Sequence, residues 1–170
     1  METTISENTT QYLSFNLAEE TFALDISKVR EVLEYTAITK IPRMPDFMCG
    51  VINLRGGVVP VVDMRLKLGM ARAERTINTC IIITDVMVDG VSATIGALAD
   101  SVKEVFDLDP SLVEPAPSIG TQVTADFLSG MGKHDGEFIL ILDIDKSFSL
   151  AELSTIRETG VEIGMSTTEG

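Results

Sequence analysis

The chain has 170 residues, 13 of them basic and 26 acidic, and a formal net charge of −13 at pH 7. Its length suits one domain or two small ones that share an interface. The negative charge repels phosphate backbones and anionic membranes, so we expect no nucleic-acid partner and no lipid surface. Two cysteines and a single histidine are too few for a disulfide framework or a zinc site.

Residues 1–9 are polar and acidic and predict a disordered N-terminus. They contain neither a basic nor an apolar segment, so they do not form a signal peptide. No apolar run in the chain approaches the ~18 residues that a membrane-spanning helix requires. We therefore expect a soluble cytoplasmic protein with no direct membrane insertion.

Two runs near the N-terminus, 13–17 and 22–26, alternate apolar with mostly polar or small residues. Alternation with a period of two predicts the two strands of a hairpin with one buried face. Ile26, Val29 and Val32 then recur at helical spacing, which predicts one helical turn before the chain becomes extended again.

The stretch GVINLRGGVVPVVDMR, residues 50–65, predicts a second hairpin. Gly56 and Gly57 adopt positive φ without steric cost, so we expect them to form its turn, with Arg55 beside them. Asp63 has the position and chemistry of an N-cap for a short helix over 64–68.

The second half of the chain repeats this pattern. Residues 29–34 match 102–107, and residues 58–64 with the glycines before them match 138–144 with theirs. A duplicated unit of about five short strands leaves few open edges only when it closes into a small barrel. We predict an all-β fold of two pseudo-symmetric five-stranded barrels with short helices.

We expect the barrels to span roughly residues 10–70 and 71–150, with exchange of strands between them possible. Residues 151–170 are expected to form a C-terminal helix or tail.

Residue patterns typical of catalysis are missing. The only histidine, His134, lies in a glycine-rich loop and is expected to be solvated. Asp143 and Asp145 lack the further oxygen ligands of a calcium loop, and helix capping explains Asp143 better. We therefore predict no catalytic residue, no cofactor and no metal.

Exposed aliphatic residues are the more informative group. Ile26 and Val29 lie on the short helical turn, and Val102 and Val105 lie on its repeat. They either fill the barrel interiors, as we expect of about half, or line the seam between the barrels. An aliphatic groove of that kind accepts the apolar stripe of a partner helix.

A set of motifs resembles the chemotaxis coupling family CheW, which includes the regulatory domain of the CheA histidine kinase and the N-terminal half of CheV. The resemblance covers roughly residues 10–150, and its most specific part is Asn53-Leu54-Arg55-Gly56 followed by Pro60 and Asp63. The motifs occur in the order Val29-Arg30-Glu31-Val32, Ile41-Pro42, residues 50–65, Leu98-Ala99-Asp100-Ser101-Val102 and residues 140–146.

The resemblance implies two intertwined SH3-like barrels and an adaptor function. Members join the cytoplasmic tips of methyl-accepting chemoreceptors to the CheA regulatory domain in membrane-associated arrays, where they control kinase activity. Carried onto this sequence, the receptor-binding groove is Leu13, Ile26, Val29 and Val102, and Glu31 and Arg55 occupy functionally sensitive positions.

Three readings of the function are open at this point. The first is the adaptor, serving flagella, pili or another output. The second is a sensor that binds a small molecule in the seam, which would require convergent polar groups there. The third is a catalytic domain, and the absence of a paired histidine or a metal cluster argues against it.

Overall fold

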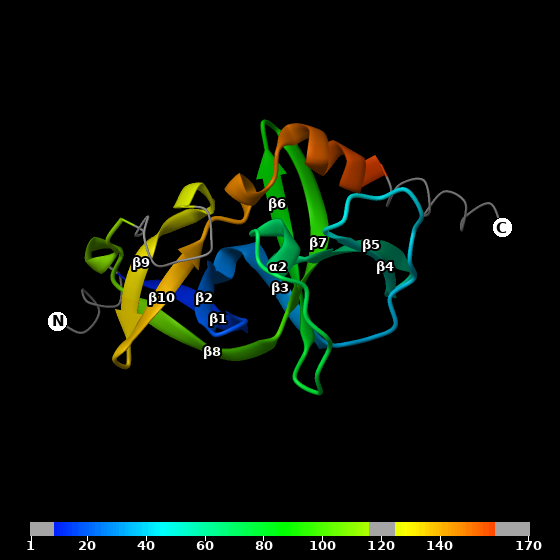
Figure 1. The fold of residues 1–170 in the computed structure, drawn as a ribbon. Helices are drawn as coiled ribbons and strands as arrows, with labels where there is room; N and C mark the ends of the chain where they lie inside the picture. Colours follow the sequence, from blue (N-terminus) through cyan, green and yellow to red (C-terminus); the bar gives the residue numbers. More distant parts are fainter. Residues whose placement is uncertain (1–8, 116–124, 159–170) are drawn as a thin grey trace.

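The computed structural model describes residues 9–115 and 125–158, and over these ranges the chain is mainly β-structure (Figure 1). The N-terminal segment predicted to be disordered lies outside the described residues except for Thr9, as does the tail from residue 159. The first barrel is the sheet β8-β1-β2-β10-β9, and the second is β3-β6-β7-β5-β4. The fold class predicted from the sequence, two five-stranded barrels with short helices, is confirmed.

The strands of the first barrel are β1 (Thr10–Leu17), β2 (Glu20–Asp25), β8 (Ser101–Leu108), β9 (Leu128–His134) and β10 (Glu137–Leu142). Those of the second are β3 (Val29–Glu34), β4 (Met48–Leu54), β5 (Gly57–Asp63), β6 (Cys80–Val88) and β7 (Val91–Ala99). Short helices are η1 (Ile26–Lys28), α2 (Met64–Lys67), η2 (Pro110–Leu112), η3 (Ala125–Phe127) and η4 (Asp145–Ser147). Residues 150–158 are also helical.

The internal repeat seen in the sequence is a repeat of structure. Its first segment forms β3 and β8, which are edge strands of their sheets, and its second forms the hairpins β4–β5 and β9–β10. In each barrel the repeated hairpin adds a parallel pair, β10 with β2 and β5 with β7. The two hairpin turns also match, because Arg55-Gly56 and Asp135-Gly136 all have positive φ, between 51° and 84°.

The expected boundary near residue 70 is wrong. The chain leaves the first barrel after β2, forms the whole second barrel with β3 to β7, and returns for β8, β9 and β10. The physical reason is that β1 pairs along most of its length with β8, which joins the N-terminal hairpin to the last three strands. The barrels therefore exchange strands, and the chain crosses between them near residues 26–28 and 100.

Three apolar clusters account for the packing. Each barrel has its own interior, around Ile139 and Ile141 in the first and around Ile81 and Ile83 in the second. The largest cluster, which we call the junction core, combines buried residues of both barrels, such as Leu17 and Ile82, with residues of the short helices. Alternation along each strand explains this division, because one face of a strand points into its barrel and the other points into the junction.

The C-terminal helix (orange to red in Figure 1) packs into the junction core through Leu153 and Ile156, both 0% exposed. A capping box starts this helix. The Ser149 backbone N–H donates to the Glu152 carboxylate at 2.9 Å, and the Glu152 N–H donates to the Ser149 hydroxyl at 3.1 Å. Sequence reasoning missed this signal, although the spacing Ser149-x-x-Glu152 was available.

Glu152 also accepts from the ammonium group of Lys67 on α2 at 3.0 Å. That ammonium lies 5.0 to 5.5 Å from the ring centroids of Phe47, Phe127 and Phe148. Burial raises the pKa of Glu152, but the Ser149 N–H and the Lys67 ammonium outweigh this effect and lower it. The carboxylate therefore joins the C-terminal helix to α2.

Replacement of Glu152 by glutamine is expected to lower the free energy of unfolding by about 1 kcal/mol, because the charged cap and the partner of Lys67 are both lost. The folded-state pKa of Glu152 is depressed, so its contribution is complete above the ordinary value of 4.5 and is lost as the pH falls through the folded-state value. Urea unfolding at pH 7 and at pH 3.5 measures both effects. The control is Glu158→Gln at the exposed end of the same helix, and equal losses for the two variants would contradict the prediction.

Candidate functional site

The four residues expected to form a receptor-binding groove meet at the junction core. Leu13 is part of it and is 4% exposed, whereas Ile26, Val29 and Val102 are half-buried and pack against it. They come from β1 and β8 of the first barrel, from β3 of the second and from η1 between them. Leu13 is covered by its neighbours, so the accessible aliphatic surface belongs to the other three.

Two further valines extend this surface. Val105 lies opposite Leu13 in the β1–β8 pair, and Val32 lies opposite Ile82 in the β3–β6 pair. Directly opposed residues share a face of the sheet, and Leu13 and Ile82 both belong to the junction core. Val105 is 50% exposed and Val32 is 41% exposed, so each edge strand continues the junction-facing side outward into solvent.

We call Ile26, Val29, Val32, Val102 and Val105 the junction valley. The predicted groove lacked Val32 and Val105. Val105 had been recognised as an exposed aliphatic residue, and the alignment of the internal repeat identifies Val32 as its counterpart. Leu13 was included in that groove through the family resemblance, which does not show which residues of a strand remain accessible.

Arg55 and Glu31 are in direct contact beside β3. The guanidinium donates through both terminal nitrogens to the carboxylate, with Nη2 to Oε1 at 2.8 Å. This bidentate pair lowers the pKa of Glu31 through the hydrogen bond from Arg55, and it raises the pKa of Arg55. The Arg55 side chain nevertheless remains 71% exposed, so it is oriented and still available to a partner.

The turn that presents Arg55 differs from the expected one. Arg55 and Gly56 have φ of 51° and 84°, whereas Gly57 already belongs to β5 and pairs with Leu54. The Gly56 N–H donates to the side-chain oxygen of Asn53 at 3.2 Å. A non-glycine residue with positive φ is uncommon, so the hairpin holds Arg55 in a conformation that its own preference does not favour.

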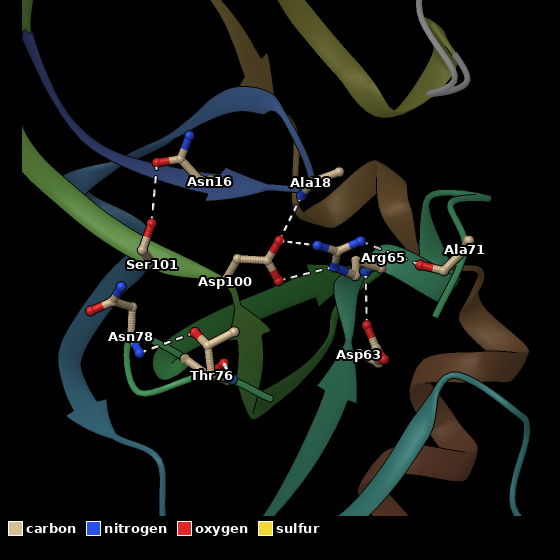
Figure 2. A network of polar contacts seen from close by, with 10 residues as sticks. Asn16, Ala18, Asp63, Arg65, Ala71, Thr76, Asn78, Asp100 and Ser101 are labelled. Atoms are coloured by element: carbon tan, nitrogen blue, oxygen red, sulfur yellow. Dashed lines mark hydrogen bonds and ion pairs between the residues drawn. The ribbon is translucent and has the colours of Figure 1, made fainter. Parts of the chain in front are cut away.

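Asp100 connects the two barrels where the chain passes from β7 to β8 (Figure 2). Its carboxylate accepts from the Ala18 N–H in the first barrel at 2.6 Å and from Nε of Arg65 on α2 at 2.9 Å. Asp63, which caps α2, positions Arg65 from the other side by accepting its backbone N–H at 3.0 Å.

The crossing near residues 26–28 also holds an ion pair, but here the crossing segment supplies the cation, whereas Asp100 supplies a carboxylate. Lys28 on η1 donates to Asp145 on η4 at 2.7 Å, and Asp145 also accepts from the Met87 N–H of β6 at 2.8 Å. At each crossing between the barrels, the carboxylate of an ion pair therefore also accepts a hydrogen bond from a backbone N–H group of a barrel. These pairs fix the relative placement of the strands that carry the junction valley.

The variant Asp100→Asn is expected to lower the free energy of unfolding by about 1–3 kcal/mol, because the largely buried Arg65 guanidinium loses its charged partner. Equilibrium urea unfolding measures this change. Asp85→Asn is the matched control, since its partner Arg30 is exposed and the predicted loss is small. A loss for Asp100→Asn no larger than for the control would contradict the role given to the crossing.

Two clefts are open on the surface of the described residues. One of about 450 Å³ lies between the β3–β4 and α2–β6 connections, and one of about 550 Å³ lies beside β5, β7 and the C-terminal helix. None of the four predicted groove residues lines either cleft. The junction valley is therefore distinct from both clefts.

The chemistry available to the described residues is limited. Burial raises the pKa of Cys49 to about 11 and also raises that of Cys80, which keeps both thiols protonated at neutral pH. Within the part of the chain that the structure describes, the one group suited to a metal is Glu104, His134 and Asp135, whose ligand atoms lie within 4.8 Å of one another. Both carboxylates are exposed, and we assign no ion to the group.

His134 is 26% exposed and stacks on Phe106, with ring centroids 4.4 Å apart. It is thus packed against the first barrel, whereas the sequence predicted a solvated side chain. In the described part of the chain, no helix is both long and apolar enough to cross a membrane.

A family model for the CheW-like domain matches residues 11–152. The chain belongs to the CheW family. The chemotaxis protein CheW of Klebsiella aerogenes is 31% identical over 146 residues, covering 86% of each chain. That of Rhizobium meliloti is 32% identical, covering 84% of this chain and 89% of the relative.

A solved structure leads to the same assignment. The scaffolding protein TtCheW from Thermoanaerobacter tengcongensis superposes with a TM-score of 0.74 at 34% identity, covering 84% of this chain and 90% of that one. The family resemblance inferred from the NLRG motif and the ordered motifs around it is confirmed. The protein is thus a member of a family of chemotaxis scaffolds.

Proposed function

We propose that this protein is a non-enzymatic chemotaxis adaptor that couples the cytoplasmic tips of methyl-accepting chemoreceptors to the regulatory domain of the CheA histidine kinase. In this role it controls kinase activity and is recruited from the cytoplasm to membrane-associated receptor arrays. Membership of the CheW family supports the proposal. The observation that carries it is the junction valley, an accessible aliphatic surface, together with an oriented arginine that is held by the same strand, β3.

The junction valley suits the side of a helical partner. Ile26, Val29 and Val102 are half-buried, so they are held in place by the core while still presenting a face to solvent. Val32 and Val105 add exposed aliphatic surface on the two edge strands. An amphipathic helix buries its apolar stripe on a surface of this kind, and the receptor tip is expected to supply such a helix.

Arg55 is proposed to contribute specificity at the border of the valley. Its guanidinium is held by Glu31 from β3, the strand that also carries Val29 and Val32. Arginine is among the residues that dominate binding energy at interfaces, and its planar fork bonds carboxylates and backbone carbonyls in pairs. Glu31 then acts through Arg55 by fixing its orientation.

Contacts with the CheA regulatory domain are proposed to use the ends of the barrels. Barrels of similar shape stack end to end without covering the valley, so one molecule can bind receptor and kinase together. The short helix α2 and the turns of the second barrel are the first segments to test for this contact. This arrangement would allow a ternary complex in which neither partner displaces the other.

Arg55→Ala is expected to weaken binding of a soluble receptor signalling fragment by about thirtyfold. The exposed side chain contributes to no apolar core, so the midpoint of thermal unfolding should not change. Isothermal titration calorimetry with the receptor fragment measures the affinity, and circular dichroism measures the unfolding.

The matched control is Arg30→Ala, which removes another exposed, ion-paired arginine from the same region of β3. It should bind like the wild type. Loss of the fold in Arg55→Ala would assign Arg55 a structural role, and equal affinities for all three proteins would contradict the proposed site.

A further inference from the structure

The cleft of about 450 Å³ lies apart from the receptor-binding surface proposed above. We call it the basic cleft. Its walls are the β3–β4 and α2–β6 connections, and its floor includes Arg65 and Asp100. Its volume lies in the range typical of ligand sites, and it is separate from the junction valley, because none of the five valley residues lines it.

The basic cleft collects several cations. Lys40 and Arg43 from one wall and Arg72 and Arg75 from the other line it. None of these four is in an ion pair within the described ranges 9–115 and 125–158. Six other basic side chains are paired, namely Lys28, Arg30, Arg55, Arg65, Lys67 and Lys103.

This clustering is unexpected in a chain with twice as many acidic as basic residues. Four acidic residues also line the cleft, and two of them face its cations: Asp100 is paired with Arg65, and Asp63 interacts with the charge of Arg72. Asp46 and Glu74 are the remaining pair. With Arg65 included, five basic and four acidic residues line the cleft, so its walls carry a small positive surplus on a molecule whose net charge is −13.

The basic cleft also offers apolar and aromatic surface. Ile38, Ile41, Met44, Met48 and Leu98 contribute to its lining. Arg75 lies over the ring of Tyr35, with its guanidinium carbon 4.1 Å from the ring centroid, which holds that arginine in place. Tyrosine, arginine and methionine are the residue types enriched where proteins bind one another.

We infer that the basic cleft binds an acidic peptide segment of a partner protein. Carboxylates of the segment pair with Arg43 and Arg72 on opposite walls, and an aliphatic side chain between them packs on Ile41 and Met48. A single small anion fits less well, because the cations stand on two separate connections and the lining between them is partly apolar. Nucleic acid is disfavoured by the negative charge of the whole molecule.

The test uses the full-length protein and a fluorescein-labelled decapeptide of alternating glutamate and leucine, followed by fluorescence anisotropy. A second peptide with glutamine in place of glutamate removes the charge and keeps the shape. Sodium tripolyphosphate is added alone and as a competitor to represent a small anion. All measurements are repeated at 0.05 M and 0.5 M salt, because screening weakens exposed charge pairs.

The glutamate peptide should bind at low salt, and the glutamine peptide should bind at least tenfold more weakly. Arg43→Ala and Arg72→Ala should each weaken binding by about two- to fivefold, and the double variant by about the product. Lys146→Ala, which removes a basic residue far from the lining, should bind like the wild type. Circular dichroism confirms that each variant is folded.

Equal binding of the two peptides, or equal effects of Arg72→Ala and Lys146→Ala, would overturn the inference. Binding of tripolyphosphate without binding of the glutamate peptide would overturn it as well, and would assign the cleft to a small anion. The outcome is distinguishable from failure of the proposed function, since Arg55→Ala should leave peptide binding unchanged.

Discussion

The two barrels share one apolar core, and most other features of the molecule depend on that constraint. Strands from both barrels turn one face toward the junction, and the C-terminal helix closes it with Leu153 and Ile156. The chain crosses the junction twice, and each crossing is held by an ion pair that is also bonded to backbone of a barrel. Neither barrel can move far from the other without breaking these contacts, so the surface between them is preorganised.

Preorganisation explains how a member of this scaffold family can present a fixed surface to a partner. The strands at the margin, β3 and β8, are edge strands, and an edge strand of exposed aliphatic residues is normally a liability. Here Val29 and Val102 are anchored in the core, while Val32 and Val105 extend the same face outward. In the proposed function, a partner helix that binds there orders few side chains, and Arg55 helps to select that helix. The basic cleft lies elsewhere on the molecule and offers a second surface with the opposite preference, for acidic rather than apolar segments.

Features that depend on neighbouring residues could be predicted from the sequence, whereas the pairing of distant strands could not. Alternation, the hairpin within residues 50–65 and the Asp63 cap each depend on a few neighbouring residues, and the structure contains all three, although the turn of that hairpin is Arg55-Gly56 and not the expected Gly56-Gly57. The repeat correctly predicted two equivalent barrels. It could not show that the hairpin of residues 10–25 belongs to the same barrel as β8, β9 and β10, and not to the barrel of the strands that follow it directly in sequence. That choice depends on pairing between β1 and β8, some ninety residues apart. The basic cleft could not be predicted for the same reason, because residues 40–43 and 72–75 are distant in sequence and come together only in the folded chain.

Methyl NMR on protein labelled at isoleucine, leucine and valine tests the central claim most directly. On addition of a receptor signalling fragment in excess, the methyl signals of Ile26, Val29, Val32, Val102 and Val105 should shift. Signals from the barrel interiors, such as Ile81 and Ile139, should stay in place, because the preorganised core does not rearrange. Binding that leaves the signals of the junction valley undisturbed would contradict the account.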